Sequence, residues 1–145
     1  MDQQPAIRTM TMTLRTATTQ DLAAIWQLYA AALGDHAQRK DAYWERLIAA
    51  GGMVVAEAET QIAGFGGIDV TAREQIQYVY VASVYQGRGI GGKILAWLAE
   101  TGWRSGLRTL QLHADPKAVG FYRRAGYHAF ASDISHDHEG MAMRK

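Results

Sequence analysis

The stretch YVYVASVYQGRGIGGKIL, from Tyr78 to Leu95, decides how the rest of the chain is interpreted. It begins as an apolar strand pattern and ends as an apolar helix pattern, and a glycine-rich loop joins the two. Loops of this kind, placed between a strand and a helix, often hold phosphate groups. Three phosphate-binding patterns fit this loop, so the residues around it must discriminate among them.

The first pattern is G-x-G-x-x-G, which Gly87, Gly89 and Gly92 spell and which is typical of dinucleotide-binding domains. Asp115 lies downstream near the position where such domains place a ribose-binding acid. In those domains, however, the first glycine follows its strand almost at once. Here five residues separate Val81 from Gly87, and little chain remains for further βαβ units. The surroundings therefore disfavour a dinucleotide site.

The second pattern is G-x-x-x-x-G-K, spelled by Gly87, Gly92 and Lys93, which makes up most of a P-loop. A P-loop needs a Ser or Thr directly after the lysine, because that hydroxyl binds the magnesium ion. This chain has Ile94 there. The chemistry of the loop therefore disfavours a nucleoside triphosphate.

The third pattern is Q-x-x-G-x-G, spelled by Gln86, Gly89 and Gly91. Successive backbone N–H groups at the start of a helix form an anion cradle, and glycines let the backbone approach a phosphate closely. Arg88 adds positive charge at the rim. A pyrophosphate fits this pattern best, although a glycine-rich turn without a ligand stays open on the loop alone.

Length and composition place limits on the protein class. A chain of 145 residues, 48% apolar and 20% charged, predicts one globular domain. The net charge of +1 does not favour a nucleic acid or an anionic membrane as the main partner. Cysteine is absent, which excludes disulfides, thiolate metal sites and a cysteine nucleophile. We interpret residues 1–11 as a flexible leader and expect a cytoplasmic protein, because no apolar run has the length of a membrane span.

Periodicity along the chain predicts alternating strands and helices. Leu22, Ile25 and Tyr29 recur at helical spacing, whereas residues 75–81 alternate as a strand. The predicted strands cover residues 13–18, 53–58, 61–70, 75–81, 109–114, 127–134 and 140–145, and the predicted helices cover residues 18–34, 41–52, 91–105 and 116–126. This order predicts a single α/β (α+β) domain with a mixed, mostly antiparallel sheet of about seven strands flanked by about four helices.

A second motif follows the glycine loop after one helix and one strand. It is DPKAVGFYRRAGY, with Asp115, Ala118, Tyr122, Gly126 and Tyr127 at its marked positions. With both motifs in this order, the chain resembles the GNAT superfamily of N-acetyltransferases over residues 12–145, which we take as the domain. The resemblance departs from the usual pattern at Asp115, where asparagine is more common.

The resemblance implies acetyl-CoA as co-substrate and transfer of an acetyl group to a primary amine of a small molecule or peptide by direct attack. A non-catalytic acyl-CoA-binding sensor or scaffold of the same fold is the alternative. Self-association into a homodimer stays open, as does the identity of the acceptor amine. The residues implied in cofactor binding are Val81, Gln86, Gly87, Arg88, Gly89, Ile90, Gly91, Asp115 and Ala118.

The resemblance also makes Tyr122 the general acid that protonates the departing thiolate. A phenol of pKa about 10 can donate to a thiolate of pKa about 8.5 at modest cost. The general base is left open: His113 and Glu74 are the candidates, with Tyr80 and a water chain as alternatives. Imidazole exchanges protons near neutral pH, which suits His113 for this role.

The first two helices are expected to form the acceptor pocket, and such pockets are largely apolar with few polar groups. Tyr29, Tyr78 and Tyr80 are our candidates for contacts with the acceptor. His136 and His138 lie two residues apart around Asp137. This spacing is too weak a signal to predict a metal site, and none is expected.

Overall fold

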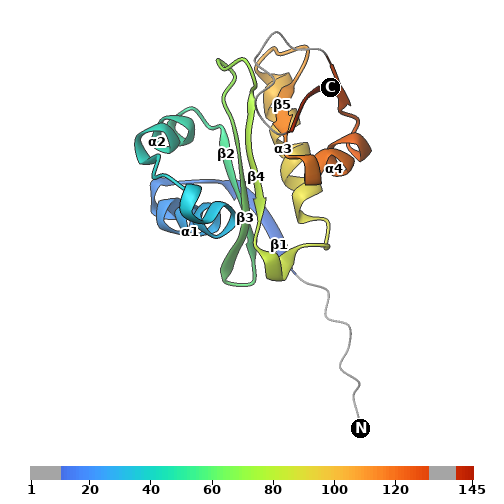
Figure 1. Ribbon diagram of the computed structural model, residues 1–145. Helices are drawn as coiled ribbons and strands as arrows, with labels where there is room; N and C mark the ends of the chain where they lie inside the picture. The colour runs from blue at the N-terminus through green and yellow to red at the C-terminus, as the bar shows by residue number, and fades with distance from the viewer. Residues whose placement is uncertain (1–10, 131–139) are drawn as a thin grey trace.

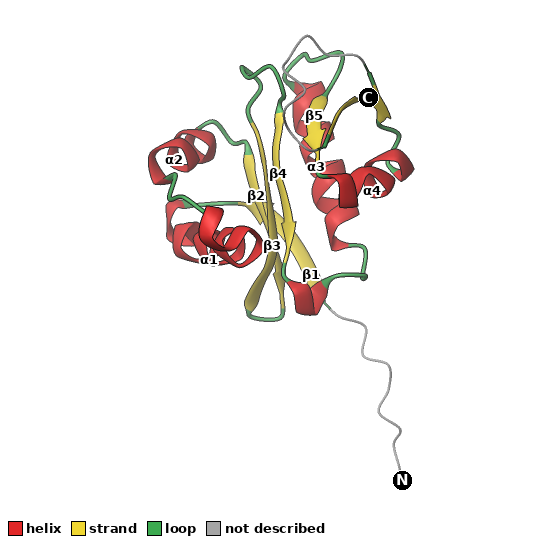
Figure 2. Cartoon of the chain, in the orientation of Figure 1, coloured by secondary structure: helices red, strands yellow, loops and turns green. Residues whose placement is uncertain are grey.

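The computed structural model describes residues 11–130 and 140–145, and its seven strands form two sheets (Figures 1 and 2). The first sheet has the order β1-β2-β3-β4 and the second β5-β7-β6, and every ladder in the described chain is antiparallel. The strands are β1 (Met12–Thr16), β2 (Met53–Ala58), β3 (Gln61–Ile68), β4 (Ile76–Val81), β5 (Gln111–Ala114), β6 (His128–Ala129) and β7 (Met141–Arg144). The predicted fold class and strand number are confirmed.

Helices cover both sides of the first sheet. Figure 2 shows helices on one side of this sheet, and further helices together with the second sheet on the other side. They are α1 (Leu22–Leu33), α2 (Asp41–Ala49), α3 (Ile90–Arg104) and α4 (Val119–Arg124). The four helices appear in the predicted order. The predicted leader lies outside the described residues except for Thr11, and the second half of the strand predicted at 127–134 lies in the undescribed segment 131–139.

Local sequence explains where the first strand ends. The strand was predicted to reach residue 18, but it stops at Thr16 because Thr18 caps the following turn. The Thr18 hydroxyl accepts from Gln20 N, and the Asp21 carboxylate accepts from Thr18 N at 2.7 Å, which forms a capping box. Arg15 of β1 donates two hydrogen bonds of 2.8 Å to the buried Asp21 carboxylate. This ion pair ties the first strand to the start of α1.

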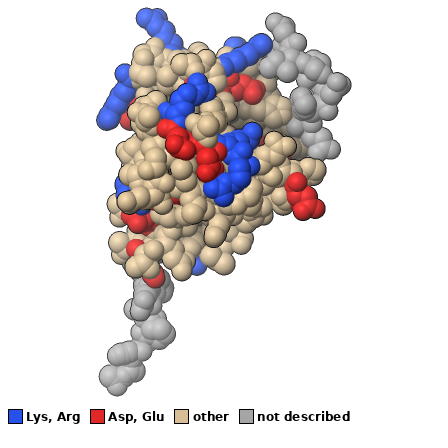
Figure 3. Space-filling view, turned by 90° about the vertical axis from the view of Figure 1, so that its left-hand side faces the viewer, with Lys and Arg blue, Asp and Glu red and all other residues tan. Residues whose placement is uncertain are grey.

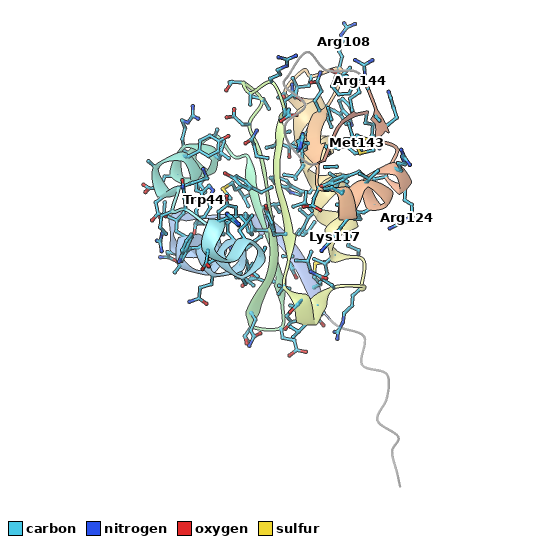
Figure 4. The ribbon with its side chains drawn as sticks, in the orientation of Figure 1. Trp44, Arg108, Lys117, Arg124, Met143 and Arg144 are labelled. Atoms are coloured by element: carbon cyan, nitrogen blue, oxygen red, sulfur yellow. The ribbon has the colours of Figure 1, made fainter. Side chains whose placement is uncertain are left out.

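Two apolar clusters hold the layers together. On the α1 and α2 side the cluster is aromatic, with Trp44 fully buried among Tyr29, Phe65 and Tyr78; Figure 4 labels Trp44 on this side. On the α3 side it is aliphatic, built around Ile94 and other buried residues of the same helix. The sheet therefore has a core on each face.

Glycines in β3 let α3 pack directly on the sheet. A Cβ atom at Gly66 would collide with the side chain of Ile94 and would lie 3.0 Å from Leu98 Cδ1. A Cβ atom at Gly64 would lie 3.1 Å from Ile94 Cδ1. Because β3 has no side chains at these two positions, α3 packs directly against its backbone. The glycine loop, which leads into α3, is thereby held close to the sheet.

The exposed face formed by α1 and α2 carries basic and acidic side chains side by side, as Figure 3 shows. Arg39 and Asp41, at the start of α2, form one such pair at 2.9 Å. Charges on this face are therefore mixed in sign. Among the described residues, no helix has both the length and the apolar character needed to cross a membrane.

Candidate active site

A cleft of about 560 Å³ opens where the two sheets separate. Near the start of β4 the sheets are still linked, because Gln111 N donates to the side-chain oxygen of Gln75 at 2.9 Å. Beyond that point no ladder joins β4 to β5 in the described chain. The cleft is lined by Ala32, Leu33, Ile76, Gln77, Tyr78, Val79, Tyr80, Gln86, Leu112, His113, Asp115, Lys117, Ala118 and Tyr122.

The β4 wall of the cleft offers backbone hydrogen-bonding groups. Ala82 N donates to Ala63 O at 2.8 Å, and the register continues with Val81 opposite Gly64 and Tyr80 opposite Phe65. In an antiparallel ladder, hydrogen-bonded and non-hydrogen-bonded pairs alternate. The N–H and C=O groups of Val79 and Val81 therefore point away from β3, toward the free edge of β4. An extended ligand could add to this edge as a strand does.

The glycine loop begins at the end of this edge. Gln86 Nε2 donates to the Val81 carbonyl oxygen at 3.0 Å, so the side chain of the loop's first residue fixes the last peptide of β4. Gly87 and Gly89 have φ values of 81° and 84°, which only glycine adopts at little cost. Gly89 caps α3, so the exposed backbone of the loop leads directly into the positive end of a long helix.

The Arg88 guanidinium stands 5.7 Å from the centre of the Tyr85 ring. A second hollow, of about 430 Å³, continues from the loop between α3 and α4, and Gly89 and Gly92 belong to its wall. Arg124 and Lys145 also line this hollow, and Figure 4 shows Arg124 on the outer side of α4. The loop thus joins the cleft to a partly basic outer groove.

Tyr122 lies in the wall opposite β4. It comes from α4, which follows directly on a 3-10 turn at Pro116–Ala118. Asp115 caps that turn, since its Oδ1 accepts from Lys117 N at 2.9 Å, and Pro116 is its first residue. Burial raises the pKa of Tyr122 to about 12, and the neighbouring Tyr80 adds to the shift. A phenol in this state stays protonated at neutral pH, as a proton donor must.

The two candidate bases lie next to each other. Glu74 Oε2 is 4.0 Å from His113 Nδ1, and both side chains are partly exposed. The other ring nitrogen of His113 lies close to the backbone of Gly140, because a Cβ atom at Gly140 would be 2.7 Å from it. The structure therefore brings Glu74 and His113 together as neighbours rather than as separate alternatives: His113 lines the cleft, and Glu74 lies behind it outside the lining.

The three tyrosines predicted at the acceptor pocket do not all line the cleft. Tyr78 and Tyr80 do, whereas Tyr29 is buried behind them with its ring edge-on to both, at centroid distances of 5.8 and 5.7 Å. Burial raises the pKa of Tyr80 to about 12, and Tyr29, Tyr78 and Asp115 contribute to the shift. These phenols are therefore neutral hydrogen-bonding groups in an otherwise apolar wall.

Sequence reasoning did not mark seven of the lining residues as site residues: Ala32, Leu33, Ile76, Gln77, Val79, Leu112 and Lys117. Leu33 ends α1, and only the way in which that helix crosses β4 brings it to the cleft. Lys117 lies in the 3-10 turn between Asp115, which the motif already marked, and α4. His136 and His138 lie outside the described residues; within the described ranges, no group of three or more His, Cys, Asp or Glu residues could hold a metal ion.

Comparisons with known proteins agree with this geometry. Residues 15–143 match the family model described as an acetyltransferase (GNAT) domain, and the sequence matches no curated protein significantly. The fold resembles that of a putative acetyltransferase from Salmonella typhimurium, solved with its cofactor acetyl-CoA, at 21% identity and a TM-score of 0.74, with 92% of each chain covered.

Two further solved structures share the fold. A PaiA N-acetyltransferase from Thermoplasma acidophilum, in complex with coenzyme A, is 16% identical with a TM-score of 0.74, covering 94% of this chain and 99% of that one. A ribosomal-protein-alanine N-acetyltransferase from Brucella melitensis is 23% identical with a TM-score of 0.75, covering 92% and 98%. Because the family model spans most of the sequence, the chain belongs to the GNAT acetyltransferase family.

Proposed function

We propose that this protein is an acetyl-CoA-dependent N-acetyltransferase that acetylates a primary amine by direct attack, within a domain covering residues 12–145. The observation that carries the proposal is the free edge of β4, where Val79 and Val81 turn their peptide groups toward a cleft whose opposite wall holds a protonated tyrosine. The CoA-bound neighbours of the same fold support this choice of co-substrate.

The residues present suit acetyl-CoA. The pantetheine arm would add to the edge at Val79 and Val81. The amides from Gln86 to Gly91 would hold the pyrophosphate, since positive-φ glycines lead there into the N-terminus of α3. The outer groove with Arg124 and Lys145 would take the nucleotide end, because cations there favour a phosphorylated group.

Acetyl-CoA supplies an acetyl group activated as a thioester. The amine nitrogen bonds to the carbonyl carbon, and the carbon–sulfur bond breaks. The N–H of Val81 would stabilise the negative charge on the carbonyl oxygen, and Tyr122 would give its proton to the departing sulfur. The pair of Glu74 and His113 would take the proton that leaves the nitrogen, directly or through water. One proton enters the pair and one leaves Tyr122, so the protein returns to its first state by exchange with solvent.

Thermal unfolding with three ligands tests the choice of co-substrate. Acetyl-CoA at a hundredfold excess over its Kd should stabilise the folded state by about 2.7 kcal/mol. NADH and ATP, which the two disfavoured loop patterns would bind, should stabilise it much less. Stabilisation by NADH or ATP without stabilisation by acetyl-CoA would refute the proposal.

A further inference from the structure

Side-chain alternation along β5 divides its residues between the two faces of the strand. Leu112 and Ala114 are buried in the aliphatic cluster on the α3 side. Because successive side chains of a strand point to opposite faces, His113 points away from α3. Asp115 directly follows the strand, and both residues line the cleft together with Leu33 of α1. The end of β5 therefore presents an imidazole and a carboxylate to the α1 side of the cleft.

The β4 wall on this side is aromatic. Tyr78 and Tyr80 belong to the cluster that α1 covers, and the Tyr80 ring lies edge-on to Tyr29 of that helix at a centroid distance of 5.7 Å. Burial is the main cause that raises the pKa of Tyr80, and the Asp115 carboxylate adds to the shift. Tyr80 in turn adds to the shift at Tyr122. Since all three also line the cleft, Asp115, Tyr80 and Tyr122 are neighbours around one part of it.

The Asp115 carboxylate has unused hydrogen-bonding capacity. Its Oδ1 accepts from Lys117 N at 2.9 Å, and within the described part of the chain this is its only hydrogen bond. A carboxylate has about four acceptor sites, and Asp115 is exposed, so a ligand can reach it. Among the described lining residues it is also the only carboxylate, because Glu74 lies outside the lining.

The α1 side of the cleft is the side left for the acceptor. In the proposed reaction Tyr122 marks the place of the departing sulfur. The rest of the cofactor would leave the cleft through the glycine loop and the groove between α3 and α4. Figure 1 shows α1 across the sheet from α3 and α4. An amine that approaches from the α1 side meets the Asp115 carboxylate next to the reacting group.

We propose that Asp115 binds the amino group of the acceptor as an ammonium ion and thereby selects amines over uncharged molecules of the same shape. The proposal rests on the proposed N-acetyltransferase activity and deepens it. Hydrogen bonds between ammonium and carboxylate groups are stronger than those between neutral groups. Asparagine, the more common residue at this position of the motif, would offer no charge. One ammonium proton passes to water before the nitrogen attacks.

The variant Asp115→Asn removes the charge and little else. Asparagine caps as well as aspartate does, so its side-chain oxygen can still accept from Lys117 N. The Lys117 side chain, which lies just before α4 (Figure 4), stays in the lining and then repels a cation. We expect KM for 2-phenylethylamine to rise about tenfold or more, as for one lost charge-assisted hydrogen bond, with a much smaller change in kcat. Asp115→Ser, which also keeps a capping oxygen, should behave in the same way.

A matched pair of ligands measures the effect of the charge directly. 2-Phenylethylamine and 2-phenylethanol share one ring and one chain, and only the amine is charged at neutral pH. Each is titrated into protein saturated with CoA, which has no acetyl group to transfer. The wild type should bind the amine about tenfold more tightly than the alcohol. Asp115→Asn should bind the two about equally, and its Kd for acetyl-CoA should stay near the wild-type value.

Glu100→Gln controls for the change in net charge. Glu100 lies on α3, pairs with Arg104 at 2.9 Å and does not line the cleft. Both KM and the preference for the amine over the alcohol should stay at their wild-type values. An equal loss in this variant would mean that the overall charge of the protein sets the preference, and the proposal would fall.

The remaining outcomes separate this proposal from the function on which it rests. Unchanged amine binding in folded Asp115→Asn protein would overturn it. A loss confined to acetyl-CoA binding would also overturn it and would assign Asp115 to the cofactor, as the resemblance implies. If the wild type does not prefer the amine while acetyl-CoA still raises the melting temperature, the proposal falls and the cofactor site stands. Failure of acetyl-CoA to bind would refute the proposed function itself.

Discussion

The phenol of Tyr122 is the group whose removal tests the chemistry with the least structural change. Tyr122→Phe keeps the ring and its packing against Phe121, 5.0 Å away between centroids. Without the proton donor, turnover should fall by about 10²–10⁴, while acetyl-CoA binding, measured by titration calorimetry, should stay near the wild-type value. A folded variant with normal turnover would remove Tyr122 from the mechanism.

Tyr127 provides the matched control for that experiment. It is a second buried tyrosine close to the first, with ring centroids 6.0 Å apart, and burial likewise raises its pKa to about 12. Its hydroxyl is buried without a hydrogen-bond partner among the described residues. Removing an unpaired buried hydroxyl costs little and can stabilise. Tyr127→Phe should therefore keep normal turnover, with an unchanged or slightly higher melting temperature.

Gln86 is expected to affect acetyl-CoA binding indirectly, because its side chain fixes the last peptide group of β4. Gln86→Leu keeps the volume of the side chain but removes the hydrogen bond to the Val81 carbonyl. Losing one such bond is worth about 0.5–1.5 kcal/mol, so kcat/KM for acetyl-CoA should fall roughly three- to tenfold. Steady-state kinetics with varied acetyl-CoA measures this change. Equal values for the variant and the wild type would show that the Val81 peptide needs no such support.

The sequence predicted individual site residues better than it predicted which of them contact one another. The two motifs marked Gln86 and Tyr122, and both line the cleft. The motifs did not show that Glu74 and His113 meet, because that contact depends on how β4 and β5 lie against each other. Tyr29 was expected at the acceptor pocket, but the same apolar spacing that places it on the inner face of α1 buries it behind Tyr78 and Tyr80. Apolar residues at helical spacing show which face of a helix is buried, but they do not show which of those residues lines a cavity.

At the scale of the elements, the turn into α3 requires the positive φ of Gly89. Gly89→Ala forces a side chain into a left-handed conformation, which costs about 1–2 kcal/mol, and the added methyl group would crowd a bound phosphate. Gly51, at the end of α2, has a similar φ of 76° and equally open surroundings. Both alanine variants should lose similar stability in thermal unfolding. Only Gly89→Ala should also lose stabilisation by acetyl-CoA; equal responses to the ligand would argue against the loop as its site.

The link between β1 and the start of α1 predicts a dependence of stability on pH. The hydrogen bonds from Arg15 lower the pKa of the buried Asp21 carboxyl below its ordinary value. A lowered pKa means that the pair stabilises the fold above about pH 4 and that this stability is lost as the pH falls through the folded-state value.

Asp21→Asn should cost about 1.5–3 kcal/mol at neutral pH, measured by urea unfolding. The difference from the wild type should shrink at low pH, where the native carboxyl becomes protonated. A difference that stays constant from pH 7 to about pH 3 would mean that the ion pair contributes nothing. The neutral side chain of asparagine retains the size of aspartate, which makes a packing effect small.

Elements were predictable where the pattern and the turn residues agreed. The strand predicted at residues 53–58 has those bounds in the structure. The next strand, predicted to residue 70, ends at Ile68, because the Asp69 carboxylate accepts from the backbone and hydroxyl of Thr71 and bends the chain. Nothing in the periodicity indicated that β4 and β5 belong to different sheets. Side-chain alternation reports the faces of a strand and not which of its edges is paired.

For the whole molecule, the separation of the two sheets is what gives the chain a candidate site. Seven strands in one continuous sheet would pair both edges of β4, and the peptide groups of Val79 and Val81 would then face another strand instead of the cleft. Because the sheets part after the contact between Gln75 and Gln111, one edge and the facing helix α4 remain available to a ligand. The central claim is therefore that acetyl transfer to an amine takes place in this opening.

The most direct test of that claim is to quantify both products in one reaction. Protein, acetyl-CoA and 2-phenylethylamine are incubated together, and mass spectrometry measures the N-acetylated amine while a thiol reagent measures free CoA. We predict equal amounts of the two products, formed by the wild type and lost together in Tyr122→Phe. Free CoA without acetylated amine, or equal yields from wild type and Tyr122→Phe, would contradict the account.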